Sequence, residues 1–271
     1  MIPMRYVNNR GSAVDLYGNG VVCDPADAIA WDLDATEVNG KVASFTSGVT
    51  TKKLSCATYG QLARRRLYEI PAYDVADLTP GRLYVGDWYL RCYVTASSQD
   101  RWWAQDGIAR YDLTVTVEDP HWLRDTTYTY TERHEGGQGL DFDYDFSYDY
   151  GYAPSTVIIQ NDNYLPADAV IRVFGPVTGP SIEIGQNTYS VGVALEQGDY
   201  LEISTADKTV RVVRLTGAVE NAFPDIVGEY MEGSGSYVFE RIPTGQSDVT
   251  WDGNFDFDIV MTERRDEPRW D

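Results

Sequence analysis

The sequence is poor in histidine and has no recognisable catalytic motif. Its 271 residues include two histidines, His121 and His134. Neither stands beside a serine or cysteine in a known nucleophile motif, and metalloprotease, serine-hydrolase and phosphate-binding glycine signatures are absent. We therefore expect no enzymatic activity, no catalytic residue, and no bound cofactor or metal ion.

Cysteine is also scarce, and no long apolar run occurs. Cys23, Cys56 and Cys92 are odd in number and do not form a CxxC pair, so we interpret them as unpaired thiols of a protein assembled in a reducing compartment. No stretch approaches the roughly 18 consecutive apolar residues that a membrane helix needs. The first residues lack the charged and apolar regions of a signal peptide. The sequence thus predicts a protein that does not enter a membrane.

The sequence contains few positively charged residues. Lysine and arginine number 22 against 42 aspartate and glutamate residues, which gives a net charge of −20. Binding to nucleic acid depends on cationic side chains that neutralise phosphates, so specific nucleic-acid binding is not expected. An anionic membrane surface is excluded as a partner for the same reason. An acidic wall would still let DNA pass without binding it.

What the chain has in abundance is tyrosine, tryptophan, glycine and proline, with 20, 7, 24 and 12 residues. This composition favours many short strands joined by turns. Alternating apolar positions in both halves predict two β-rich domains, 1–135 and 155–271, joined by residues 136–154. The second is expected to be all β, with strand candidates at 156–160, 169–174, 181–184, 188–193, 199–204, 208–215, 236–242, 247–251 and 254–262.

Local signals add detail to the first domain. Asn39-Gly40 predicts a hairpin turn, because both residues tolerate positive φ. Helical spacing predicts one helix near 58–70 that Pro71 ends. Leu83 to Thr95 is expected to form one long strand.

Four residues of the first domain are candidates for contacts between subunits. Arg64 and Arg65 fall on the outer face of the expected helix, where they form either a solvated face or a basic surface that meets an acidic neighbour. Trp102 and Trp103 are adjacent in an extended segment, and two such side chains cannot both enter one core.

Residues 139–152 alternate between aromatic and mostly acidic residues. An extended chain would place the aromatic side chains on one face, so we expect this face to be buried against the domains or a neighbouring subunit. Asp141, Asp143 and Asp145 do not complete a calcium loop, because the glycine and the glutamate that such a loop needs are missing. The aromatic positions of this inter-domain segment are Phe142, Tyr144, Phe146, Tyr148, Tyr150 and Tyr152.

Three passages together resemble the distal tail proteins of long-tailed (siphovirus-type) bacteriophages. The strand that ends in Thr-Val-Thr-Val-Glu-Asp-Pro-His-Trp at 114–122 is similar to the close of that family's first domain. The segment 141–152 resembles its inter-domain segment. The passages 237–245, 248–258 and 267–270 resemble the last strands of its second domain.

The resemblance implies a fold and a role. It implies a β-sandwich-like first domain with one helix that forms a hexameric ring, followed by a galectin-like antiparallel β-sandwich. The protein would be a structural part of the virion at the tail tip, assembled in the host cytoplasm. Its partners would be the tail tube protein on one side and a hub, lysin, fibre or receptor-binding protein of the baseplate on the other, with DNA passing through the ring.

Two alternatives from other classes remain open at this point. One is a self-standing carbohydrate-binding β-sandwich protein, since tyrosine and tryptophan on sheets suit sugar stacking. The other is a different fibre or hub component of a phage tail. The sugar-binding pattern of galectins is not visible in the sequence, so we expect the second domain to be a docking platform.

Overall fold

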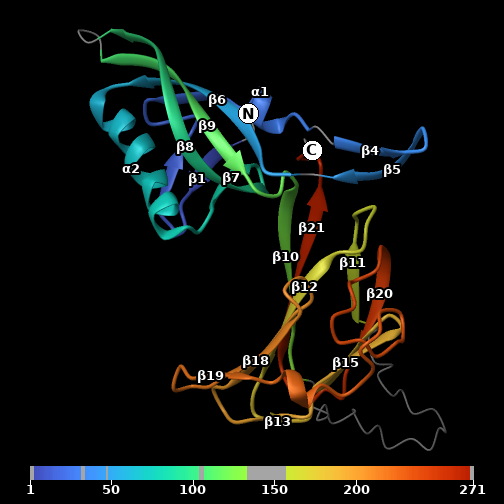
Figure 1. Cartoon of the computed structure of the whole chain (residues 1–271). Coiled ribbons are helices and arrows are strands. Elements are labelled where there is room, and N and C mark those ends of the chain that lie inside the picture. Colours follow the sequence, from blue (N-terminus) through green and yellow to red (C-terminus); the bar gives the residue numbers. More distant parts are fainter. Residues whose placement is uncertain (1–2, 32–33, 47, 104–106, 133–156, 269–271) are drawn as a thin grey trace, which may run out of the picture. The chain divides into compact units, whose positions relative to one another are not determined.

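A computed structural model describes residues 3–31, 34–46, 48–103, 107–132 and 157–268 (Figure 1). Strands predominate over helices in this part of the chain, and every strand pair with a defined register is antiparallel. One long helix is present. The mainly β fold with a single substantial helix is therefore confirmed.

The chain divides into two compact units. The first comprises Met1–Arg124 together with Arg264–Asp271, and the second comprises Asp125–Glu263. The expected ranges of 1–135 and 155–271 differ from these units in two respects. The first unit ends earlier than 135, and the C-terminal end of the chain returns to the first unit instead of remaining in the second.

The first unit contains most of the chain's helical residues. Its helices are α1 (Ala26–Ile29) and α2 (Gln61–Asp77). Its strands are β1 (Met4–Val7), β2 (Ala13–Asp15), β3 (Val21–Asp24), β4 (Asp34–Val38), β5 (Lys41–Thr46), β6 (Thr50–Tyr59), β7 (Gly81–Val85), β8 (Trp88–Trp103), β9 (Ile108–Val117) and the first residues of β10 (Trp122–Tyr130).

Strand β8 connects two sheets of the first unit. Its first residues pair with β7, which pairs with β1, and β1 pairs with β2. From Tyr93 onward, β8 pairs with β9, which pairs with β6, and β6 pairs with β3. Alternate residues of these strands enter one core, where Tyr111, Leu113, Leu67 and Trp122 are among the largest fully buried side chains.

The expected single strand from Leu83 to Thr95 is wrong, because a turn at Gly86-Asp87 divides it into β7 and β8. Gly86 has φ of 62°, a value that glycine adopts without the steric cost that a side chain brings. The predicted hairpin at Asn39-Gly40 is confirmed. Both residues have positive φ, 55° and 72°, between β4 and β5.

Helix α2 passes through Pro71, so the expected end of the helix at this residue is wrong. A proline inside a helix removes one backbone hydrogen bond and costs about 3 kcal/mol. Asp74 stabilises the helical turn that follows Pro71. Its buried carboxylate accepts a hydrogen bond from the Tyr6 hydroxyl at 2.6 Å and another from the Asn9 backbone at 2.6 Å. The helix then stops at Leu78, which adopts the left-handed conformation.

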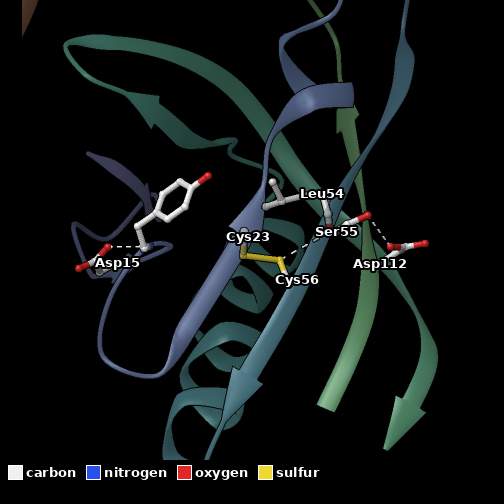
Figure 2. Close-up of a disulfide and its surroundings, with 7 residues drawn as sticks. Asp15, Cys23, Leu54, Ser55, Cys56 and Asp112 are labelled. Atoms are coloured by element: carbon white, nitrogen blue, oxygen red, sulfur yellow. Dashed lines mark hydrogen bonds between the residues drawn. A yellow bond between two sulfur atoms is a disulfide. The ribbon is translucent and has the colours of Figure 1, made fainter. Parts of the chain in front are cut away.

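The structure also corrects the interpretation of the cysteines. Cys23 and Cys56 are opposite each other on β3 and β6, with Cα atoms 4.1 Å apart, and their sulfur atoms form a disulfide (Figure 2). Both are buried in the core of the first unit. Cys92 is a buried free thiol, and burial raises its pKa to about 12. Only Cys92 therefore fits the expectation of unpaired thiols.

The second unit is a sandwich of two antiparallel sheets. One has the strand order β19-β18-β17-β12-β21-β10, and the other has the order β11-β20-β14-β15. A pair of short strands, β13 and β16, and a 3₁₀ helix, η1 (Phe223–Asp225), complete the unit. The strands are β11 (Val157–Asn161), β12 (Asp168–Phe174), β13 (Val177–Thr178), β14 (Ser181–Ile184), β15 (Asn187–Ser190), β16 (Ala194–Leu195), β17 (Tyr200–Ser204), β18 (Thr209–Val213), β19 (Val219–Asn221), β20 (Gly245–Thr250) and β21 (Phe257–Arg265).

Most expected strands of this unit are observed, but 236–242 is not a strand. Val238, Phe239 and Ile242 are buried in the core of the second unit. Ile242 forms an isolated bridge with Ala167. The segment is apolar because it covers the core as a loop, and sequence alternation alone does not distinguish that from a strand. Among the described residues, no helix is long and apolar enough to cross a membrane.

Candidate functional site

The start of α2 forms an exposed surface with basic and apolar side chains. The side chain of Arg65 is 71% exposed, and its Nε donates to Glu69 Oε1 at 2.6 Å. This hydrogen bond raises the pKa of Arg65, so its positive charge is kept. The guanidinium of Arg64 lies 6.0 Å from the centre of the Tyr68 ring. Leu62, on the same turns, is 64% exposed.

The β8–β9 hairpin lies beside this surface. The carbonyl of Gly107, directly before β9, accepts a hydrogen bond from the Gly60 backbone at 2.8 Å. A hollow of about 380 Å³ between the two elements is lined by Arg64, Arg65 and Ala109, among others. The structure thus brings the beginning of α2 and the end of this hairpin together, although they are far apart in the sequence. We call this the α2–β9 surface.

The two tryptophans that the sequence singled out are on the neighbouring strand of this hairpin. Trp102 and Trp103 lie in β8, and their backbones pair with Ala109 and Ile108 of β9. Their side chains are outside the described part of the structure. Because Ala109 lines the hollow, all four candidate contact residues belong to, or pair with, the α2–β9 surface. Their role in subunit contacts remains a prediction.

The β4–β5 hairpin was not identified from the sequence as a contact element. Within the described residues its two strands pair only with each other. Val38 and Val42 are 54% and 52% exposed. An isolated two-stranded hairpin is marginally stable in water. In the sequence, the Asn39-Gly40 turn predicts the hairpin. It does not indicate which residues or which partner cover the two strands.

His121 belongs to a cluster of charges and not to a nucleophile dyad. Its Nδ1 contacts Asp119 Oδ1, and its Nε2 lies 3.5 Å from Asp266 Oδ1. Arg264 donates to the same oxygen of Asp119 at 3.1 Å. Asp119 is thus paired with an arginine of the same chain. Across the described residues, no group of three or more His, Cys, Asp or Glu side chains is arranged to hold a metal ion. His134 and the aromatic residues of 139–152 lie outside the described residues.

No protein-family model matches the chain, and no curated protein matches it. Solved structures of phage hub and baseplate proteins do match. The crystal structure of the SPP1 Dit protein, described as a paradigm of the hub adsorption apparatus in phages that infect Gram-positive bacteria, aligns with 98% of this chain and 99% of its own. The TM-score is 0.57 at 11% identity.

Two structures of the phage P2 baseplate in its activated conformation give the same result. The one with Ca has a TM-score of 0.59 at 12% identity and covers 98% of this chain and 99% of the matched chain. The one with Sr has a TM-score of 0.58 at 12% identity and covers 99% of this chain and 100% of the matched chain. At such low identity the match establishes the fold. The chain has the fold of these phage proteins along its whole length.

Proposed function

We propose that the chain is a distal tail protein of a long-tailed bacteriophage. It forms a ring of six copies at the tail tip, as a structural part of the virion. The observation that carries this proposal is the shared two-unit fold, which spans 98% of this chain and 99% of the SPP1 Dit chain. If the likeness came from a module found in many unrelated proteins, the alignment would cover only one unit of this chain. Here the alignment covers both units.

Ring formation requires two different surfaces on each copy, because head-to-tail contacts close into a ring. The α2–β9 surface supplies one candidate, with Arg65 and Leu62 exposed. The other surface would be acidic, and the net charge of −20 makes such a surface available on the same chain. The β4–β5 hairpin is a third element whose exposed valines a neighbouring copy would cover.

The ring would join the tail tube protein on one side to a hub, lysin, fibre or receptor-binding protein on the other. The second unit serves as the docking platform for the latter. DNA passes through the ring without binding, since its wall would be acidic or neutral. We propose no catalytic activity and no cofactor for this chain. The cluster around His121 supports this, because the carboxylate of Asp119 is paired with Arg264 of the same chain.

Electron microscopy of the encoding virus tests the proposed location. Antibodies raised against the purified chain are applied to intact particles together with a gold conjugate. The proposal predicts label at the tail tip and none on the head or along the tail shaft. Label spread along the shaft would contradict it, and so would particles that lack the protein. A self-standing carbohydrate-binding protein, the alternative function, would not be a fixed part of the particle.

A further inference from the structure

The second unit contains a hollow of about 960 Å³, larger than the two hollows of the first unit. It lies where three segments meet: the turn between β14 and β15, the loop at 233–244, and the beginning of β20. Its volume is at the upper end of the range for small-molecule sites in proteins, roughly 300–1,000 Å³. Neither the fold nor the proposed ring assigns it a role.

Hydrogen bonds made by two buried residues hold the loop against the hairpin and fix the walls of this hollow. The Asn187 amide donates to the Tyr237 carbonyl at 2.9 Å, and its oxygen accepts from the Tyr237 backbone at 3.2 Å. The Tyr189 hydroxyl donates to the Glu240 carbonyl at 2.8 Å. Asn187 and Tyr189 are 7% and 2% exposed. The hollow is therefore formed before any ligand arrives, which lowers the entropy cost of binding.

Several polar side chains that line the hollow have no partner within the described structure. The amides of Gln186 and Gln246 and the carboxylate of Asp248 are exposed and make no hydrogen bond or ion pair with another described side chain or backbone group. Thr244 adds a hydroxyl to the same wall. Amides and hydroxyls both donate and accept hydrogen bonds, and carboxylates accept them. Together these side chains offer a ligand both donors and acceptors.

The charges of the lining select against anionic ligands. Arg241 is the single cation among the lining residues, and Glu240 and Asp248 are anions. A phosphate or carboxylate ligand would meet two anions and one guanidinium, whereas such ligands are bound by several cationic donors. A lipid-like ligand would leave the amides unpaired, which is costly.

An extended peptide is also a poor fit, because it would need a free strand edge. β11 pairs with β20 along one edge, and β14 pairs with the other edge at Val249 and Thr250. Within the described residues, the edge left open on β20 is confined to Gly245–Ser247, which is short for an added strand. The outer edge of β15 is covered by loops, since Thr188 donates to the Gly235 carbonyl at 2.9 Å and Val227 donates to the Ser190 carbonyl at 3.0 Å. Recognition here depends on side chains and not on the backbone.

We propose that this hollow is a binding site for a neutral, hydroxyl-rich ligand, namely an oligosaccharide of a few sugar units. Each sugar hydroxyl donates and accepts, which matches the free amides of Gln186 and Gln246 and the carboxylate of Asp248. The site is independent of ring formation, so the two proposals fail separately.

A glycan array probed with the labelled full chain tests this inference, and isothermal titration with a neutral oligosaccharide hit follows. The array carries neutral and anionic oligosaccharides together with extended polar peptides. We expect binding to neutral oligosaccharides only. Gln186→Ala and Gln246→Ala should each weaken the affinity about tenfold, the effect of losing about one good hydrogen bond. Gln197→Ala, an exposed glutamine in the turn before β17 and outside the hollow, is the matched control and should bind like the wild type.

Three results would overturn the inference. They are no binding to any neutral oligosaccharide, preferential binding to phosphorylated sugars or to peptides, and sugar binding that both glutamine variants retain. Each variant is checked by its melting temperature. Gln186 and Gln246 are exposed, so the fold is expected to tolerate their replacement.

Discussion

The Cys23–Cys56 disulfide closes the part of the chain that carries α1 and the β4–β5 hairpin. The two residues are 33 positions apart in the sequence. Closing a loop of this length restricts the unfolded chain and stabilises the fold by about 3–4 kcal/mol in the chain-entropy model. It ties β3 to β6 at the base of the hairpin segment (Figure 2).

We therefore predict that replacing both cysteines by serine lowers the free energy of unfolding of the first unit by about 3–4 kcal/mol. Urea denaturation under oxidising conditions measures this. A reducing agent should destabilise the wild type to a similar extent and leave the double variant unchanged. Cys92→Ala is the control, since it keeps the disulfide and should retain the response to reductant. A wild-type midpoint that is insensitive to full reduction would contradict this prediction.

The odd number of cysteines suggested free thiols, and the sequence offered nothing to correct that interpretation. Whether two cysteines face each other depends on the register of β3 against β6. That register is set by packing between segments that lie far apart in the chain, so it is invisible to local patterns.

In the second unit, Glu202 lies between two arginines. Arg172 Nε donates to Glu202 Oε2 at 2.8 Å, and Arg211 Nη2 donates to its Oε1 at 2.5 Å. Burial alone raises the pKa of Glu202, but the hydrogen bonds from both arginines outweigh it and the pKa is lowered. The lowered pKa makes the carboxylate stabilise the fold above its unfolded pKa of about 4.3. That stability is lost as the pH falls through the folded value.

Glu202→Gln should accordingly destabilise the second unit at pH 7, by about 1.5–3 kcal/mol. The difference from the wild type should shrink at pH 3, where the wild-type carboxyl group gains a proton as well. Urea denaturation at both pH values measures it. Glu183→Gln, an exposed glutamate on β14, is the control and should behave like the wild type at each pH. An equal difference at pH 7 and pH 3 would show that the charge of Glu202 is not what stabilises the fold.

Among the elements, α2 is the one for which contacts outside the chain are most directly predicted. Its first turns present Arg65 and Leu62 beside the β8–β9 hairpin. Arg65→Glu should weaken or abolish ring assembly, because it reverses the charge facing an acidic neighbour. Size-exclusion chromatography with light scattering measures the number of copies.

Two variants separate this effect from the helix itself. Glu69→Gln removes the intrahelical partner of Arg65, an exposed pair that contributes little to stability, and should leave assembly intact. Arg65→Lys keeps the charge and should assemble. If Arg65→Glu assembles like the wild type, α2 faces solvent in the ring.

Elements that depend on local signals were predictable, and those that depend on distant contacts were not. The hairpin at Asn39-Gly40 requires only two residues with positive φ, and it is present. Helix α2 continues through Pro71 because Tyr6 and Asn9, from the start of the chain, bind Asp74. The loop 236–242 is apolar because it covers the core of the second unit. Neither fact could be read from nearby residues.

For the whole molecule, the balance of charge is the dominant physical property. With a net charge of −20, the chain as a whole should repel a nucleic-acid backbone. We predict that the purified protein does not retard linear duplex DNA in a gel at low salt. The readout is the mobility of the DNA. A retarded band that disappears as salt is added would reveal a cationic surface and contradict the proposed passage of DNA.

The two-unit division was predictable from the composition and alternation of both halves, but its boundaries were not. The return of Arg264–Asp271 to the first unit depends on partners far away in the sequence. Glu267, for example, accepts a hydrogen bond from the indole of Trp31 at 2.9 Å. The α2–β9 surface likewise depends on contacts between distant parts of the sequence. Its residues were singled out individually, and only the fold brings them together.

The proposed function requires that six copies of this chain close into a ring. Single-particle electron microscopy of the purified full chain at high concentration tests it most directly. We expect class averages with a closed ring of six copies. In them the first units touch through the α2–β9 surface, and the lumen is lined by acidic or neutral side chains. Particles that remain monomeric at every concentration, or a lumen lined by lysine and arginine, would contradict it.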